Sequence, residues 1–325
     1  MKTCSFRNAK PSLYSHHGIF SIHEPKSLYG LKPCEQVTCR FCFPIQDVLI
    51  RGRQSQPVVQ FSSAQKHRFV NGYEAILNCP VTCTAKNIIY ALTCPCGQFD
   101  YIGYTSLTLD EQLKYHREHG NRIIHEFILG SVNSSRMRQH TKSQEELTAD
   151  NMLLYKHSAR CSYAIQMFLD CNPQYWCFVP MSTMEAETQN LRSDLSSVYT
   201  AFDDQEASTY MTDLPPLPSE NHTFSVHQRS KQIQLLKDKH ECLKPNLHLD
   251  LYNATIIAVM PEGYTELFYR LIEALFITHA QTKLNTLGHL DGMIVENNNS
   301  NDINARIVDD RRGNWCQDLV RRPPM

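Results

Sequence analysis

Cysteines are the residues of this chain whose type and spacing most directly indicate metal chemistry. Cys34, Cys39 and Cys42 lie close together, and the last two form a C-x2-C pair. Such a pair turns both sulfur atoms toward one point, which suits a tetrahedral zinc ion. The fourth ligand stays open among several later residues, namely Cys79, Cys83, Cys94, Cys96 and, as an outsider, His67. A set of four protein ligands would make the zinc structural, because no position is left for water.

A different interpretation of the same cysteines is that they are free thiols packed as small apolar side chains. The chain has 13 cysteines and no apolar N-terminal run typical of a secretory signal. We therefore expect a reducing intracellular location, nuclear or cytoplasmic, where grouped cysteines bind metal more often than they form disulfides. We therefore expect the grouped cysteines to bind zinc.

A hairpin followed by a helix is predicted over residues 87–119. The apolar and β-branched run Ile88–Thr93 and the run Phe99–Gly103 flank a Pro-Cys-Gly turn. Thr108 is a good N-cap residue, and acidic residues in the first turn favour a helix that starts there. The strands would bring Tyr90 and Tyr101 to neighbouring positions, where cross-strand side chains can meet.

A strand and a second helix are predicted near the end of the chain. Residues 254–259 form an apolar, β-branched run, and Tyr264–His279 has the pattern of a helix. Glu273 falls on the side of this helix that carries Glu266 and Arg270. That side is turned away from three apolar residues, namely Phe268, Leu271 and Leu275.

These two stretches together resemble a GIY-YIG endonuclease domain, most closely the endonuclease region of Penelope-like retroelements. The first strand carries Ile88-Ile89-Tyr90, with Ile88 where the family has glycine, and the second carries Tyr101-Ile102-Gly103. The first helix carries His116-Arg117. The last helix carries Glu273-Ala274-x-x-Ile277, and Leu284-Asn285 follows it. The upstream cysteines fit this branch as well.

The resemblance implies hydrolysis of phosphodiester bonds in DNA with a divalent metal, Mg²⁺ or Mn²⁺. By this resemblance Tyr90 or Tyr101 would help to activate water, and His116 would position or shuttle protons. Glu273 would hold the magnesium, which is commonly bound by one or two carboxylates and several waters. Gly103 and Asn285 occupy two further motif positions.

One position departs from the family in a way that bears on activity. The arginine of the first helix, one turn before His116, is replaced by Gln112. Glutamine donates hydrogen bonds but carries no charge, and the loss of a transition-state cation lowers rates by roughly 10²–10³. Arg117 and Arg122 are nearby, but they could substitute only if the end of the helix were aimed differently.

The chain between the two halves is longer than this domain requires. Helices are predicted over residues 142–155, 164–169, 184–198 and 227–240, a strand over Tyr175–Val179, and an acidic proline-containing linker over 195–221. The strand and the helix that follows it make Glu185 and Glu187 rivals of Glu273 as the metal ligand.

We therefore divide the chain into six parts. They are an irregular lead-in (1–33), a cysteine-containing segment (34–86), the first half of the domain (87–130), an insertion (131–250), the closing half (251–288) and a tail expected to be disordered (289–325). Within the cysteine-containing segment, weak alternation of apolar and polar residues over 47–78 favours an extra hairpin.

Charge and hydropathy add two expectations about partners. The net charge is −1, but residues 1–78 carry ten Lys/Arg against four Asp/Glu, a balance suited to phosphate. No apolar run is long enough to cross a membrane.

The predicted fold is α/β: a small, mainly antiparallel three-stranded sheet flanked by helices, with a helical insertion and an N-terminal cysteine cluster. The predicted function is a metal-dependent DNA endonuclease. The alternative is a catalytically inactive, zinc-stabilised nucleic-acid-binding protein of the same fold.

Overall fold

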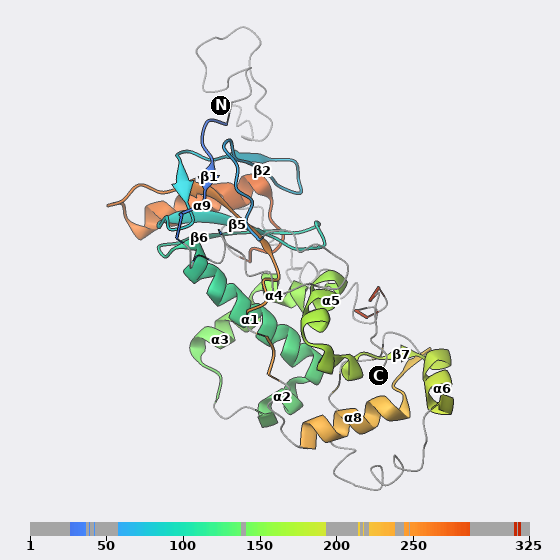
Figure 1. Cartoon of the computed structure of the whole chain (residues 1–325). Helices are drawn as coiled ribbons and strands as arrows, with labels where there is room; N and C mark the ends of the chain where they lie inside the picture. Colours follow the sequence, from blue (N-terminus) through green and yellow to red (C-terminus); the bar gives the residue numbers. More distant parts are fainter. Residues whose placement is uncertain are drawn as a thin grey trace, which may run out of the picture.

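Three antiparallel strands form the largest sheet of the structure. The computed structural model describes residues 27–36, 39, 42, 58–137, 141–192, 214, 217, 221–237, 244–246, 248–286, 315, 316, 318 and 319. Strands β5 (Ile88–Thr93), β6 (Asp100–Thr105) and β9 (Asn253–Val259) lie in the order β6-β5-β9, so the hairpin and the late strand share one sheet (Figure 1). The structure thus has the mixed α/β class and the small antiparallel sheet that were predicted.

Both faces of the central strand β5 are buried. Tyr90 and Leu92 belong to the core shared with helix α1 and the inserted helices. Ile89 and Ala91, which point the other way, belong to a smaller core shared with helix α9. Burial on both faces explains why β5 is an uninterrupted apolar run and does not alternate with polar residues.

Helix α1 (Leu109–Leu129) begins where the sequence predicts. The Thr108 hydroxyl accepts a hydrogen bond from the Glu111 backbone N–H, and the Glu111 carboxylate accepts one from the Thr108 N–H. This capping box satisfies two backbone donors that the first turn would otherwise leave unpaired. The helix ends at Gly130, which has a φ of 86°.

Helix α9 (Glu266–Ala280) packs along β6, but its leucines are not its packing face. Leu271 and Leu275 are 47% and 38% exposed, whereas Ala274 and Ile277 are buried. Arg270 does lie on the side of Glu273, as predicted. The helix begins at its N-cap Thr265, and Gln281 follows it in the left-handed conformation.

The inserted part of the chain is mainly helical, as predicted. It contains α2 (Ser131–Met137), α3 (Gln144–Asn151), α4 (Leu153–Ser158), α5 (Ser162–Cys171), the 3-10 helix η2 (Pro173–Phe178), β7 (Met181–Ser182), α6 (Thr183–Arg192), β8 (His222–Thr223) and α8 (Val226–Lys237). Helices α6 and α8 lie at the end of the molecule away from α9 (Figure 1).

The prediction of a strand over Tyr175–Val179 is wrong, because most of this segment belongs to the 3-10 helix η2. Pro173 starts the 3-10 turn, and the aromatic residues Tyr175, Trp176 and Phe178 are buried from it. A short apolar run fits a buried helical turn as well as a strand, so the pattern alone does not separate them. Most of the predicted acidic linker lies outside the described residues.

Two small sheets precede the hairpin. β1 (Leu31–Lys32) pairs in parallel with β4 (Val81–Thr82), and β2 (Lys66–Arg68) pairs with β3 (Glu74–Ile76) as an antiparallel hairpin. The hairpin predicted within residues 47–78 therefore exists. Residues Phe69–Tyr73 form its turn, which contains Gly72 at a φ of 85°.

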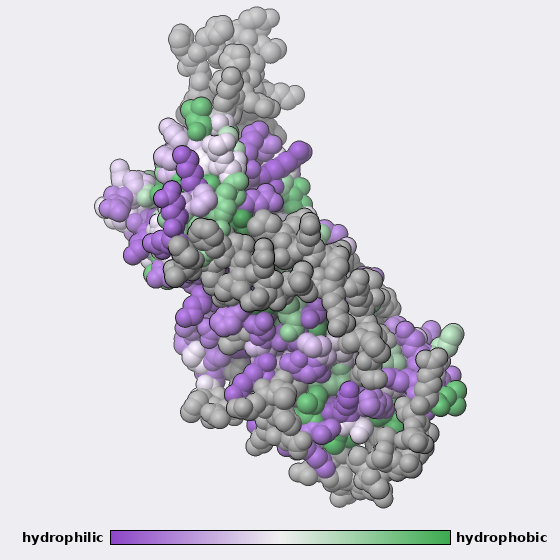
Figure 2. Space-filling model, in the orientation of Figure 1, coloured by the Kyte–Doolittle hydropathy of each residue, from purple (hydrophilic) through white to green (hydrophobic). Residues whose placement is uncertain are grey.

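Hydrophilic residues cover most of the described surface on the face seen in Figure 2, and hydrophobic residues are scattered among them. The predicted lead-in and the predicted disordered tail lie mostly outside the described residues. Of the tail, Trp315 and Cys316 are described and are buried, and Trp315 packs edge-on against Phe127 of α1.

Candidate functional site

Tyr90 and Tyr101 meet on one face of the β5–β6 hairpin. Gly103 lies directly opposite Tyr90 in the register, and Tyr101 lies diagonally, with the two tyrosine rings 6.5 Å apart between centroids. A Cβ atom at position 103 would lie 2.5 Å from the Tyr90 hydroxyl. Glycine is therefore needed here because the Tyr90 ring lies across it, and not because the chain turns.

His116 joins this pair from helix α1. Its Nε2 lies 2.9 Å from the Tyr90 hydroxyl, and its Nδ1 lies 2.8 Å from the hydroxyl of Tyr155 on α4. The ring of Tyr101 packs edge-on against the imidazole. Burial, with a contribution from His119, lowers the pKa of His116 to about 3, so the imidazole is neutral at neutral pH.

Both tyrosines at the site keep their protons at neutral pH. Burial raises the pKa of Tyr90, and Tyr101 and the Glu273 carboxylate raise it further. Burial also raises the pKa of Tyr101, and here the Glu273 carboxylate contributes next. The Glu273 carboxylate thus acts electrostatically on both tyrosine hydroxyls, although it comes from helix α9 and they come from the hairpin.

Glu273 lies at the free edge of β6. Its Oε1 accepts a hydrogen bond of 2.9 Å from the Tyr104 backbone N–H, and no strand of the described part of the chain pairs with β6 on that side. Its Oε2 lies 3.0 Å from Nη1 of Arg270, whose guanidinium is also over the Tyr104 ring. The side chain of Glu273 is 12% exposed and that of Arg270 is 55% exposed.

Asn285 contacts the same edge of β6 at Ile102, two residues before the Tyr104 that Glu273 contacts. Its side-chain amide donates to the Ile102 carbonyl at 2.7 Å, and its Oδ1 accepts from the Ile102 N–H at 3.0 Å. Asn285 therefore pairs with β6 as a neighbouring strand would. This fixes the segment after α9 against the hairpin and gives Asn285 a structural part in the site.

Gln112 reaches His116 with its side chain, and its Nε2 lies 3.4 Å from the His116 Nε2. The two arginines that could replace a lost cation are occupied elsewhere. Arg117 is buried against Asp250, and Arg122 pairs with Glu126 and Asp150. Their charges are therefore directed away from the tyrosines.

The rival glutamates do not join this group of residues. Glu185 accepts hydrogen bonds from the hydroxyl and backbone N–H of Ser182 and so caps α6. Glu187 is exposed on the same helix. Since α6 lies at the far end of the molecule from the sheet, Glu273 is the glutamate that shares a site with the tyrosines (Figure 1).

The early cysteines form one group of four. Cys34, Cys39, Cys42 and Cys83 bring their sulfurs together, with separations of 3.4–3.6 Å between neighbours. These cysteines are free, and the separations far exceed a disulfide bond of about 2.05 Å. Sulfurs around one zinc at 2.3 Å are about 3.8 Å apart, so this group could hold a metal ion such as zinc.

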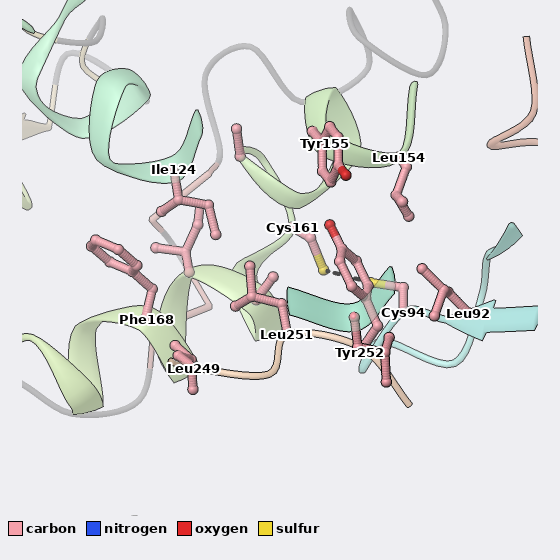
Figure 3. Packing of buried hydrophobic residues seen from close by; sticks show 14 of the residues in the cluster. Leu92, Cys94, Ile124, Leu154, Tyr155, Cys161, Phe168, Leu249, Leu251 and Tyr252 are labelled. Atoms are coloured by element: carbon pink, nitrogen blue, oxygen red, sulfur yellow. Dashed lines mark hydrogen bonds between the residues drawn. The ribbon is translucent and has the colours of Figure 1, made fainter. Parts of the chain in front are cut away.

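The hairpin-tip cysteines belong to a second group, and they do not complete the first. Cys94 and Cys96 lie with His157 of α4 and with Cys161, which precedes α5. His157 Nε2 is 3.2 Å from the Cys94 sulfur and 3.6 Å from that of Cys96, and the Cys94 and Cys161 sulfurs are 3.6 Å apart. Figure 3 shows the sulfurs of Cys94 and Cys161 facing each other in the core. A Cys3His set also suits zinc.

His157 and Cys161 were missed in the sequence because they lie in the insertion. Their His-x3-Cys spacing was the available signal, since it can turn two ligands toward one point. Among the described residues, Cys79 and His67 join neither group. His67 packs edge-on against Phe69, and burial lowers its pKa.

No protein-family model matches the chain, and the searches of curated proteins and of solved structures also found no match. Among the described residues, no helix is both long and apolar enough to pass through a membrane.

Proposed function

We propose that this protein is a GIY-YIG-like endonuclease that hydrolyses phosphodiester bonds in DNA. The observation that carries the proposal is that Tyr90, Tyr101 and His116 meet on one face of the hairpin, while Glu273 reaches the outer edge of β6 from a helix far along the chain. The charge of Glu273 acts on both tyrosine hydroxyls, and each of the four residues holds a motif position of the resemblance.

The residues divide the work according to their contacts. Tyr90 offers a hydroxyl oxygen that can take a proton from an attacking water, because its own proton can pass to His116 at 2.9 Å. Tyr101 lies beside it and orients the same water or a phosphate oxygen. Hydrogen-bond donors held in place at such a site stabilise charge that develops on the phosphate.

Glu273 is the residue that would hold Mg²⁺ or Mn²⁺, which would polarise the phosphate oxygens when bound. One carboxylate suits magnesium, since this ion keeps several waters. The Glu273 Oε2 is paired with Arg270, and this guanidinium has to move for a metal to bind that oxygen. The side chain of Arg270 is 55% exposed and can do so, and its charge would then be available to the phosphate.

Zinc has a structural part in this proposal. The Cys4 group joins the segment before the hairpin to Cys83, and the Cys3His group joins the hairpin tip to the inserted helices. With four protein ligands each, neither site leaves a position for water. We therefore assign both to the stability of the fold.

Nicking of supercoiled plasmid DNA with Mg²⁺ or Mn²⁺ tests the nuclease proposal. Glu273→Gln removes the charge and keeps an oxygen that can accept from the Tyr104 N–H, so its fold should survive. We expect the wild type to nick and Glu273→Gln to lose at least about 10² in rate. Glu187→Gln on α6 is the matched control and should nick like the wild type. Equal nicking by all three proteins would contradict the assignment.

The second candidate function is DNA binding without cleavage, and Gln112 is the observation that favours it. A protein that binds DNA but does not nick it would have kept the fold and lost the chemistry. Measuring the affinity for DNA at 50 mM and 200 mM salt then shows whether the protein binds through phosphate contacts, because such contacts weaken steeply with salt. Gln112→Arg restores the missing cation and is expected to create cleavage in such a protein.

A further inference from the structure

Both ring nitrogens of His116 are held by tyrosine hydroxyls. Tyr90 lies at Nε2 and Tyr155 at Nδ1, at 2.9 and 2.8 Å. The imidazole is 2% exposed and neutral, so one nitrogen carries a hydrogen and the other accepts one. Because a tyrosine hydroxyl can donate or accept, these two contacts alone fit either tautomer.

The position of Gln112 favours one of the two tautomers. Its side-chain nitrogen lies 3.4 Å from the His116 Nε2, and an amide nitrogen can only donate. This contact favours a His116 Nε2 that accepts, and we assign the hydrogen of the ring to Nδ1. The Nδ1–H then donates to the Tyr155 oxygen, and the Tyr90 hydroxyl donates to Nε2.

We propose that Tyr155 is a positioning residue, which holds His116 in the tautomer that can receive the proton of Tyr90. The order of contacts is Tyr155, His116 and Tyr90, so a third group orients a base that serves the reacting hydroxyl. During attack a water proton moves to the Tyr90 oxygen, the Tyr90 proton moves to His116 Nε2, and the water oxygen bonds to phosphorus. The P–O bond to the leaving sugar breaks at the same time, its electron pair stays on the leaving oxygen, and that oxygen takes a proton from solvent water. This proposal rests on the nuclease function proposed above.

Tyr155 comes from the insertion and not from either half of the sheet domain. It lies on α4, two residues before His157, which is grouped with the hairpin-tip cysteines. Helix α4 therefore contacts the hairpin tip through His157 and the catalytic histidine through Tyr155. The first contact fixes the position of the helix, and with it the position of the Tyr155 hydroxyl.

The plain alternative is that Tyr155 is a core residue whose buried hydroxyl has found a partner. The chain contains a matched control for this alternative. Tyr175 is also fully buried, and its hydroxyl lies 2.6 Å from Nδ1 of His125, which is on α1 as well. Tyr175→Phe, on η2, therefore removes the same kind of hydroxyl contact to a histidine of α1, but away from the tyrosine pair.

The test combines a tautomer measurement with kinetics on the full chain loaded with zinc. Nitrogen-15 NMR of the His116 ring at pH 7 reports which nitrogen carries the hydrogen. We expect the Nδ1–H form in the wild type and in Tyr175→Phe, and loss of that form in Tyr155→Phe. In plasmid nicking, Tyr155→Phe should lower kcat by about tenfold or more with little change in KM, since a hydrogen bond to a group that becomes charged is lost.

The NMR arm needs no variant to fold, because the wild type alone can overturn the assignment by showing the Nε2–H form. Unchanged tautomer and unchanged kcat in a folded Tyr155→Phe protein would also overturn it. If the wild type shows the Nδ1–H form and Tyr155→Phe loses it while no protein nicks DNA, the nuclease function fails and the hydrogen-bond arrangement stands.

Discussion

Gly103 makes the candidate site possible by having no side chain. The Tyr90 ring lies over it, and three ring and hydroxyl atoms would come within about 3 Å of an added Cβ. The glycine was predicted from the sequence as a motif position, but its reason could not be. That reason depends on the register of two strands and on the direction in which Tyr90 points.

Gly103→Ala should destabilise the protein by about 1–3 kcal/mol, because the new methyl group overlaps a buried ring that has no room to shift. The measurement is urea unfolding of the full chain. A double-mutant cycle with Tyr90→Leu is the control, since the smaller side chain should absorb most of the penalty. A penalty that is unchanged in the Tyr90→Leu background would mean that the overlap is not with Tyr90.

His116 should make stability depend on pH. Its pKa is about 3 in the folded chain, against an ordinary value near 6.5. Between these values the unfolded chain binds the extra proton, so this stability is complete above pH 6.5 and is lost as pH falls toward 3. The loss is at most about 1.4 kcal/mol per pH unit.

His116→Gln should therefore flatten the fall in unfolding free energy between pH 6.5 and 4.5, measured by urea unfolding at several pH values. His248→Gln, which removes an exposed histidine, is the comparison. If the two variants and the wild type have the same slope, His116 is not buried as a neutral group.

Elements with strong local signals were the most predictable part of the fold. The capping box at Thr108, the apolar run of β5 and the run of β9 are local, and their helix and strands form as expected. The strand prediction for Tyr175–Val179 failed because a five-residue apolar run has no clear period and tertiary contacts decide its structure. The partners of the hairpin-tip cysteines could not be predicted, because they depend on where α4 docks.

The two faces of α9 should respond differently to truncation. Ile277 is 2% exposed in the core beneath the sheet, so Ile277→Ala should cost about 2–5 kcal/mol. Leu267 is 79% exposed, and Leu267→Ala should change stability by no more than about 0.5 kcal/mol. Urea unfolding measures both. Comparable losses would mean that the leucines of α9 are covered in solution.

At the scale of the whole molecule, the two cysteine groups connect segments that are far apart in the chain. The first spans 44 residues between Cys39 and Cys83, and the second spans 67 residues between Cys94 and Cys161. A metal that closes such long loops removes conformational freedom from the unfolded chain, and it stabilises the folded state because it binds that state preferentially.

The full chain should therefore bind two zinc ions, and a chelator should lower its melting temperature. Cys83→Ser and Cys161→Ser should each reduce the zinc content by one and leave the other site intact, whereas Cys79→Ser, outside both groups, should keep two zinc ions.

Limited proteolysis distinguishes the effects of losing the two sites. Loss of the second should expose the inserted helices near α4, and loss of the first should expose the chain before β4. One zinc per chain in the wild type would contradict one of the groups, and the single variants would show which. Because Tyr155 is on the helix that carries His157, loss of the second zinc should also lower nicking more than loss of the first.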